Sequence, residues 1–327
     1  MRYLITGGAG FIGSHLTDAL VARGDSVLVL DDLSTGRREN LEPALATGAA
    51  ELVEGSILDA PLVEECVGAT DVCLHLAAAV GVELILDHPL DSLICNVRGS
   101  DIVISSVVER RGKVLVVSSS EVYGKNSVGP LAETSDRILG PPSTARWAYA
   151  TAKAFSEVLA NAYGYETAAE SLVVRLFNTV GPRQSPAYGM VLPRLVGQAL
   201  AGEDLTVYGD GSQTRCFAHV ADVVEAILLL CDAEQAVGHT FNIGSPGEIS
   251  IYDLAQRVLE RTASDSDIRL VPYDEAYGKG FEEIGRRHPD LSQIHRITGW
   301  SPVRTIDDMV DDVIADQQAR VEMNEVA

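Results

Sequence analysis

The sequence of 327 residues predicts an α/β protein built on a doubly wound parallel sheet, with a smaller α/β region toward the C-terminus. Short apolar runs alternate with helical patterns to about residue 177, and a glycine-rich turn follows the first of these runs. Alternation of this kind indicates a parallel sheet with helices on both faces. After Asn178, loops rich in glycine and proline separate short helices, and this change predicts the second, smaller region.

The first apolar run, residues 2–6, leads straight into the turn GGAGFIG at 7–13 and then into a helical pattern. Glycines let the backbone approach a pyrophosphate, and a helix N-terminus offers free N–H groups to an anion. A second run ends at Asp31, about 20 residues after the glycines, where a carboxylate accepts from ribose hydroxyls and repels the extra phosphate of NADP. The pattern predicts a Rossmann-type site for NAD rather than NADP, formed by Gly7, Gly10, Phe11, Ile12, Gly13 and Asp31.

The remaining elements follow in order along the chain. Further strands are predicted at 26–30, 50–54, 71–76, 114–118 and 171–177, with helices that include 90–110 and 148–163. Residues 220–231 are predicted as a helix and 240–243 as a strand that rejoins the main sheet, whereas the residues from about Arg320 are expected to fray. We therefore predict an NAD-binding domain of residues 1–177 with 218–245, and a substrate domain of 178–217 and 246–327.

Bulk composition narrows the class of protein. A hydrophobic content of 46% supports a full core, and the net charge of −22 argues against nucleic acids and anionic membranes as partners. There is no apolar run of ~18 residues, and Met1 leads almost directly into the first strand, leaving no room for a signal peptide. The five cysteines stand singly in apolar stretches, and no histidine shows metal-ligand spacing. We expect a soluble cytoplasmic protein without a metal site.

Tyr149 and Lys153 are four residues apart in a predicted helix and therefore share one helical face. The ammonium group is expected to lower the pKa of the phenol from ~10, so that a phenolate accepts an alcohol proton as hydride leaves the carbon. This spacing alone is weak, because many helices carry it on a solvated face. A serine run at 118–120 ends the apolar strand 114–118, and Ser119 is expected to complete the set.

These motifs, with LFNTVGPR at 176–183 and LTVYGDGSQTRCF at 205–217, resemble the extended short-chain dehydrogenase/reductase family of nucleotide-sugar epimerases, dehydratases and decarboxylases. The resemblance covers nearly the whole chain. Within the family, the sequence is most similar to UDP-glucuronate decarboxylases, on LGP at 139–141 with RWAY at 146–149, and on YGKGF at 277–281 with RRHPD at 286–290. The resemblance implies an NAD-dependent enzyme whose second domain binds a nucleotide sugar.

The resemblance also assigns roles to single residues. It puts Ser119 in the catalytic hydroxyl position, with Ser120 and Glu121 beneath the sugar. Related 4,6-dehydratases have Asp-Glu at the places of Ser120 and Glu121, and epimerases usually have small or uncharged residues there, so Ser-Glu is the decarboxylase pairing. Arg287 matches the arginine that meets the substrate carboxylate, with Arg286 beside it as the alternative.

Further positions complete the predicted binding site. Asn178, Arg183 and Arg215 match family positions that hold the sugar and the diphosphate, which suits the guanidinium fork. The predicted cofactor site also includes Asp32, Ala77, Asn96, Tyr149 and Lys153. Ser56 stands where the family commonly has an Asp for the adenine, so this contact is expected to move to Asp59 or to the backbone. The loop 80–83 lacks the aromatic and proline residues of many decarboxylases, which leaves the substrate open.

The implied reaction is oxidation of UDP-glucuronate at carbon 4, loss of carbon dioxide, and either reduction to UDP-xylose or release of the UDP-4-keto-pentose. A 4-epimerase acting on UDP-glucose or UDP-glucuronate remains an alternative, because it uses the same Tyr, Lys and NAD. A 4,6-dehydratase is disfavoured by Ser120, and a non-catalytic NAD-sensing protein by the presence of both Tyr149 and Lys153. Apolar residues on more than one face of 90–110 and 148–163 predict a homodimer, since family members pair these helices across a two-fold axis.

Overall fold

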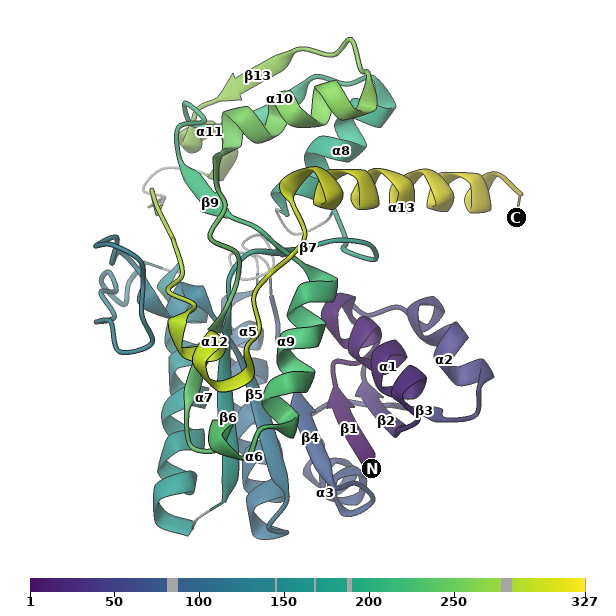
Figure 1. Cartoon of the computed structure of the whole chain (residues 1–327), viewed down its shortest axis with the longest axis vertical. Coiled ribbons are helices and arrows are strands. Elements are labelled where there is room, and N and C mark those ends of the chain that lie inside the picture. Colours follow the sequence, from purple (N-terminus) through teal and green to yellow (C-terminus); the bar gives the residue numbers. More distant parts are fainter. Residues whose placement is uncertain (81–87, 145, 168, 187–189, 278–283, 327) are drawn as a thin grey trace.

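A computed structural model describes residues 1–80, 88–144, 146–167, 169–186, 190–277 and 284–326, and confirms the predicted doubly wound α/β fold (Figure 1). The main sheet has seven parallel strands in the order β11-β6-β5-β4-β1-β2-β3. These strands are β1 (Arg2–Thr6), β2 (Ser26–Asp31), β3 (Ala50–Glu54), β4 (Val72–His75), β5 (Lys113–Ser119), β6 (Glu170–Leu176) and β11 (Thr240–Ile243). The chain order reverses between β1 and β4, which is where such folds bind ligands.

Helices cover both faces of this sheet because the strand residues alternate between two apolar cores. Tyr3 and Ile5 pack on one face, with α1 (Phe11–Arg23), η1 (Arg38–Leu41), α2 (Glu42–Ala46), α9 (Val220–Asp232), η4 (Glu234–Ala236) and α12 (Ser292–Thr298). Leu4 packs on the other face, with α3 (Ala60–Gly68), α6 (Ser100–Glu109) and α7 (Trp147–Thr167). The predicted strand at 240–243 is present and pairs with β6.

The helix predicted at 90–110 is interrupted. Its first part is α5 (Pro89–Ile94), a π-helical turn η2 (Cys95–Gly99) follows, and α6 completes it. In this turn the amide of Asn96 accepts a hydrogen bond from Ala79 N at 2.8 Å and donates one to Ala79 O at 3.0 Å. The π-helical turn therefore fixes the loop that follows β4. Positions 81–83 of that loop lie outside the described residues, as do 278–281 of the YGKGF motif.

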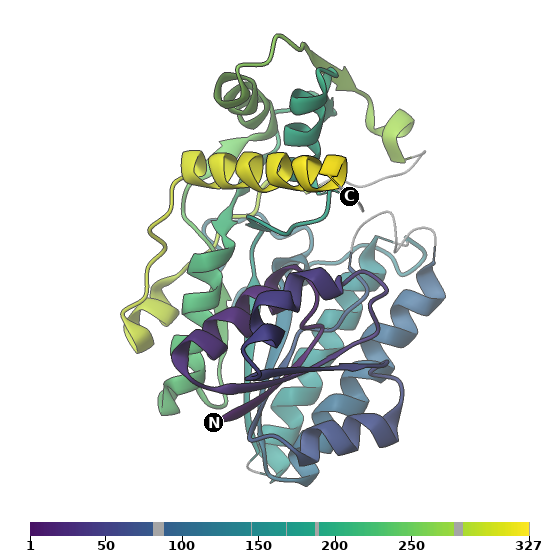
Figure 2. The same ribbon diagram turned by 90° about the vertical axis from the view of Figure 1, so that its right-hand side faces the viewer.

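The smaller region has its own apolar core, in which Leu195, Leu254 and Val310 are fully buried. Its elements are β7 (Thr179–Val180), α8 (Val191–Ala201), β8 (Leu205–Tyr208), β9 (Thr214–Cys216), β10 (Ala218–His219), β12 (Glu248–Ser250), α10 (Ile251–Thr262), β13 (Ile268–Val271), α11 (Tyr273–Tyr277) and α13 (Ile306–Val326). The expectation of a frayed end from Arg320 is wrong, because α13 continues to Val326. Figure 2 shows this region above the carboxyl ends of the main strands. No helix in the described ranges is long and apolar enough to cross a membrane.

Candidate active site

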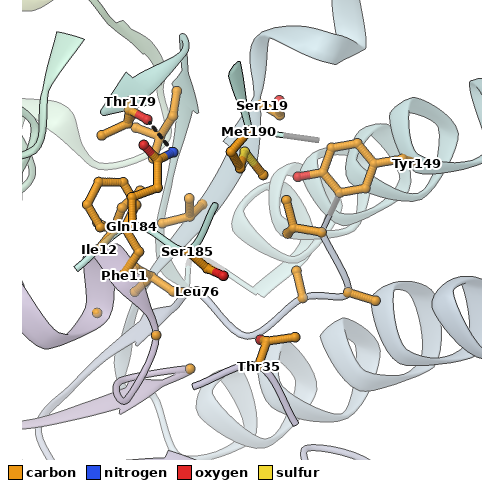
Figure 3. Close-up of a pocket in the computed structure, with 18 of the residues that line it drawn as sticks. Phe11, Ile12, Thr35, Leu76, Ser119, Tyr149, Thr179, Gln184, Ser185 and Met190 are labelled. Carbon is orange, nitrogen blue, oxygen red and sulfur yellow. Dashed lines mark hydrogen bonds between the residues drawn. The ribbon is translucent and has the colours of Figure 1, made fainter. Parts of the chain in front are cut away.

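A cavity of about 980 Å³ lies between the carboxyl ends of the strands and the smaller region. The β1–α1 turn and the ends of β2, β4 and β5 line its floor, and α7, α8 and the segment around Arg287 line the rest. Figure 3 shows Phe11, Ile12 and Gln184 on one side of this cavity and Ser119 and Tyr149 on the other. The cavity thus brings together the glycine-rich turn and the predicted hydride-transfer residues.

The glycine-rich turn has the shape that a dinucleotide needs. Gly7 has a φ of +73°, and a Cβ there would lie 2.7 Å from Ala77 N. A Cβ on Gly13 would collide with the carbonyl oxygen of Gly7. The N-cap of α1, Gly10, makes no side-chain hydrogen bond, so the first-turn N–H groups remain available to an anion. The turn therefore fits the pyrophosphate of NAD.

Two carboxylates lie at the carboxyl end of β2, at the edge of this cavity. Asp31 accepts hydrogen bonds from Ala9 N and Leu33 N, both at 2.9 Å, and burial raises its pKa although these bonds oppose the shift. The bonds hold the carboxylate at the place predicted for ribose recognition. Asp32 also lines the cavity, with one oxygen held by Ser34 N at 3.0 Å and the Ser34 hydroxyl at 2.6 Å.

Three residues of the predicted cofactor site have placements that sequence patterns do not reveal. Asp59 does not line the cavity, since its carboxylate accepts from Leu62 N and caps α3. The predicted adenine contact from Asp59 or the backbone stays a prediction, and Ser56 and its neighbours Ile57 and Leu58 do line the cavity. Asn96 is hydrogen-bonded to the backbone of Ala79, which lines the cavity, and Ala77 lines it directly.

Tyr149, Ser119 and Lys153 meet where α7 crosses the end of β5. The Ser119 hydroxyl is hydrogen-bonded to the Tyr149 phenol and also accepts from Glu121 N at 3.2 Å. Nζ of Lys153 donates to Val117 O at 2.8 Å and lies 6.0 Å from the centroid of the Tyr149 ring. Burial lowers the pKa of Lys153 to about 8. All three residues line the cavity.

The pKa of Tyr149 differs from the expectation. Burial raises it and the negative charge of Glu121 raises it further, while the hydrogen bond from Ser119 opposes them. The predicted lowering of this pKa is therefore not found in the free protein, because burial and Glu121 outweigh the hydrogen bond from Ser119.

Glu121 lies against two arginines at the side of the cavity that holds Tyr149. Its Oε1 is 2.7 Å from Nη2 of Arg287, and its Oε2 is 3.7 Å from Nη2 of Arg146. Burial raises the pKa of Glu121, but Arg287 and Arg146 more than offset this, so the pKa is lowered. Nη1 of Arg287 also donates to the Ser120 hydroxyl at 3.3 Å.

The two neighbouring arginines at 286 and 287 point to different places. The Arg287 side chain is 4% exposed and lines the cavity, whereas Arg286 is 44% exposed and pairs with Glu248 at 2.8 Å outside it. Arg287 is thus the member of the pair that faces a ligand. Arg146, in the RWAY motif, receives no role from the sequence, because only the fold brings it to Glu121.

The LGP and RWAY segments pack together. Gly140 of LGP contacts the indole of Trp147 in RWAY, and a Cβ at Gly140 would collide with that ring.

The residues predicted to hold the sugar and diphosphate also line the cavity. Asn178 donates to Cys216 O at 3.4 Å, and Arg215 donates to Thr214 O at 2.8 Å. Arg183 has a left-handed φ of +67° and pairs with Asp18 of α1 at 2.7 Å, while its Nη1 is buried without a hydrogen-bond partner among the described residues. A strained backbone and an unsatisfied donor in a cavity are consistent with a ligand site.

His75 is buried at the end of β4. Its ring nitrogens are hydrogen-bonded to Thr6 at 2.8 Å and Ser100 at 3.0 Å, and burial lowers its pKa to about 3. Cys95 lines the cavity, whereas the other four cysteines are buried. Among the described residues, no group of three or more His, Cys, Asp or Glu side chains is placed to hold a metal ion.

The chain is similar to known proteins in sequence and in structure. The chain matches the NAD dependent epimerase/dehydratase family over residues 3–244. It is 40% identical over 302 residues to a UDP-N-acetyl-alpha-D-glucosaminuronate decarboxylase from Bacillus cytotoxicus, covering 92% of each chain. It is 35% identical to UDP-glucuronic acid decarboxylase 2 from Arabidopsis thaliana, covering 92% of this chain and 65% of that protein. The crystal structure of a UDP-glucose 4-epimerase from Thermotoga maritima with UDP-glucose covers 98% of this chain and 100% of its own, with a TM-score of 0.88 and 29% identity.

These matches confirm the family predicted from the motifs, the similarity to UDP-glucuronate decarboxylases, and NAD as the cofactor. The glycine turn, Asp31 and the Tyr149–Lys153 pair thus lie in a cavity of the kind expected of this family. The chain belongs to the NAD dependent epimerase/dehydratase family.

Proposed function

We propose that this protein is an NAD-dependent UDP-glucuronate decarboxylase that forms UDP-xylose, the UDP-4-keto-pentose, or both. The observation that carries the proposal is the buried Arg287 guanidinium, held by Glu121 and Ser120 beside Tyr149. A neutral sugar has no charged group that could pair with this arginine. The carboxylate of a uronate can accept two parallel hydrogen bonds from the guanidinium. The names of the 40% and 35% identical relatives support a decarboxylase.

In the proposed reaction, Gly7, Gly10, Gly13 and Asp31 hold NAD, which supplies the oxidation of carbon 4 and the later reduction. Tyr149 takes the proton of the 4-hydroxyl, and Ser119 orients the phenol through their hydrogen bond. The resulting β-keto acid loses carbon dioxide because the ketone stabilises the enolate. The hydroxyls of Tyr149 and Ser119 are proposed to stabilise the negative charge of this enolate. Arg183, Arg215 and Asn178 are proposed to hold the diphosphate and the sugar.

A second uronate is a candidate substrate. The relative at 40% identity is named for UDP-N-acetyl-alpha-D-glucosaminuronate, which carries an acetamido group at carbon 2 in place of a hydroxyl. The carboxylate chemistry proposed for Arg287 is the same for both uronates. Assays therefore include both compounds, and the relative kcat/KM values decide between them.

A UDP-sugar 4-epimerase is the alternative function, since the UDP-glucose 4-epimerase from Thermotoga maritima shares the fold over 98% of this chain. An epimerase uses Tyr149, Lys153 and NAD in the same way but rotates the keto sugar instead of breaking a carbon–carbon bond. Glu121 and Arg287 argue against a 4-epimerase of UDP-glucose, because rotation of a neutral sugar needs neither charge. A 4-epimerase of UDP-glucuronate is separated from the decarboxylase by the release of carbon dioxide.

We expect Tyr149→Phe to lower kcat by roughly 10²–10⁴-fold, because the variant loses its positioned proton acceptor. NAD binding should stay nearly intact, since the ring remains in place. Turnover is followed by product chromatography and NAD affinity by thermal shift. Wild-type turnover in this variant would remove Tyr149 from the mechanism.

We expect UDP-glucuronate in heavy water to release carbon dioxide and to incorporate deuterium at carbon 5 of the product. The reason is that the enolate is protonated by a group that exchanges with solvent. Gas release and mass spectrometry are followed together. An epimerase releases no carbon dioxide and incorporates no deuterium at carbon 5. Formation of UDP-galacturonate, with all six carbons of the sugar retained, would refute the decarboxylase and support the epimerase.

We expect Arg287→Ala to lower kcat/KM for the uronate by roughly 10²–10³-fold, comparable to the loss of one preorganised electrostatic contact. The affinity for UDP-glucose, which has no carboxylate, should change much less. Arg286→Ala is the matched control, because that neighbour pairs with Glu248 outside the cavity. Equal losses for the two variants, or for the two sugars, would contradict the assignment.

We also propose a homodimer built from α5 and α7. These helices contact each other and expose Leu90 at 67%, Ile94 at 39%, Phe155 at 39% and Val158 at 56%, whereas Val103 and Val107 of α6 are buried against the sheet. An isologous two-fold interface would cover this exposed face.

The dimer is checked by light scattering at micromolar concentration. Val158→Glu should shift the protein toward monomer, because it places a charge in the apolar contact. Val128→Glu, at a loop position that is 82% exposed, is the control and should leave the mass unchanged. A monomeric wild-type protein would refute the dimer.

A further inference from the structure

In the free protein, the carboxylate of Glu121 already pairs with Arg287, the arginine that is proposed to bind the substrate carboxylate. Its two oxygens face Nη2 of Arg287 at 2.7 Å and Nη2 of Arg146 at 3.7 Å. Both guanidinium groups are nearly buried, with side-chain exposures of 4% and 8%. A substrate carboxylate that binds these arginines therefore comes to lie beside the carboxylate of Glu121.

The pattern of used and unused donors on Arg287 determines where the second carboxylate binds. Nη1 donates to the Ser120 hydroxyl and Nη2 to Glu121, while Nε is buried without a hydrogen-bond partner among the described residues. Nε and Nη2 form the side-on edge of the guanidinium, which binds a carboxylate through two parallel hydrogen bonds. A ligand carboxylate on this edge must share Nη2 with Glu121, so the two carboxylates come close together.

Charged or titratable groups face Glu121 from each described element around it. Arg287 comes from the segment before α12, Arg146 from the residue before α7, Arg215 from β9 and the phenol of Tyr149 from α7. In the free protein the three arginines keep the carboxyl charged. A bound uronate adds its own carboxylate and engages part of that positive charge, and a like charge at such short range favours the protonated form of one carboxyl group.

We propose that Arg146 and Arg287 together receive the substrate carboxylate, and that Glu121 takes up one proton from solvent as this carboxylate binds. The proposal rests on the proposed function, because it needs a uronate in the site. It assigns to Arg146 a part in recognising the uronate and to Glu121 the storage of a proton before any bond is broken.

The stored proton is the one that the reaction consumes. Loss of carbon dioxide breaks the bond between carbon 5 and the carboxylate carbon, and the electron pair of that bond passes into the enolate. The Glu121 proton then forms the new bond to hydrogen at carbon 5, and neutral carbon dioxide departs. Glu121 returns to the carboxylate that pairs with Arg287. One proton is bound with the substrate and one ends on carbon 5, so the count balances.

The test is isothermal titration calorimetry of the NAD-loaded Tyr149→Phe variant, whose turnover is expected to be strongly reduced, at pH 7.5 in phosphate and in Tris. Chromatography of the sample after the titration checks that the substrate is intact. The difference in heat between two buffers of unlike ionisation enthalpy gives the number of protons bound. The ligands are the two UDP-uronates named above and, as the control with the same diphosphate, UDP-glucose. We expect about one proton taken up per uronate and near zero for UDP-glucose.

Two variants locate the proton and the second arginine. Glu121→Gln in the same background should abolish the uptake while the uronate still binds. Arg146→Ala should weaken the uronate by roughly 10–100-fold, the range for a lost hydrogen bond to a charged group, and UDP-glucose much less. If Tyr149→Phe does not fold, the wild-type protein with the reduced cofactor forms the same non-reacting complex.

The outcomes separate this proposal from the proposed function. Carbon dioxide release in the heavy-water assay, with no proton uptake beyond that of UDP-glucose, overturns the proton proposal alone. Uptake that persists in Glu121→Gln overturns it as well, because another group then binds the proton. Uptake with a uronate that never releases carbon dioxide supports the proton proposal and refutes the decarboxylase. Failure of both uronates to bind overturns both.

Discussion

The buried ion pair between Glu157 and Arg175 is the contact on which the arrangement of the site depends. Glu157 lies on α7 and Arg175 on β6, and both are almost fully buried. Two hydrogen bonds join them, at 2.7 Å and 3.0 Å, and Ser118 of β5 donates to the same carboxylate at 2.5 Å. Removing one partner of such a pair typically costs about 3–5 kcal/mol, because a charge is left buried without compensation. The pair therefore fixes α7 on β5 and β6 in one position.

This position matters because α7 carries Tyr149 and Lys153 in the same row as Glu157, each four residues from the next. The network also reaches the segment that carries Arg287. Arg175 donates to the Tyr123 hydroxyl at 2.9 Å, Tyr123 donates to Asn242 at 2.7 Å, and the amide of Asn242 donates to the carbonyls of Leu131 and Asp290. The segment of Arg287 is thus held in register with the phenol of Tyr149 by one set of buried hydrogen bonds.

Because the protein as a whole is strongly acidic, the arginines of the cavity are needed to attract an anionic substrate. With a net charge of −22, the molecule repels anions at long range, and a nucleotide sugar must be attracted locally. Arg146, Arg183, Arg215 and Arg287 all line the one cavity, which also holds the uncapped N-terminus of α1. The free protein balances part of this positive charge with its own carboxylates, Asp18 against Arg183 and Glu121 against Arg287. Substrate anions are therefore expected to replace or join internal partners.

The sequence by itself determined the sheet strands to within one or two residues, the glycine turn, Asp31 and the pairing of Tyr149 with Lys153, because these depend on local periodicity and short spacing. Tertiary structure decided what depends on contacts between distant segments. It placed Arg287 in the cavity and Arg286 outside it, and it brought Arg146 close to Glu121. Asp59 caps a helix, and Asn96 is hydrogen-bonded to the backbone of Ala79. Nζ of Lys153 donates to Val117 O. The raised pKa of Tyr149 followed from burial and from the nearby charge of Glu121, which no spacing in the sequence encodes.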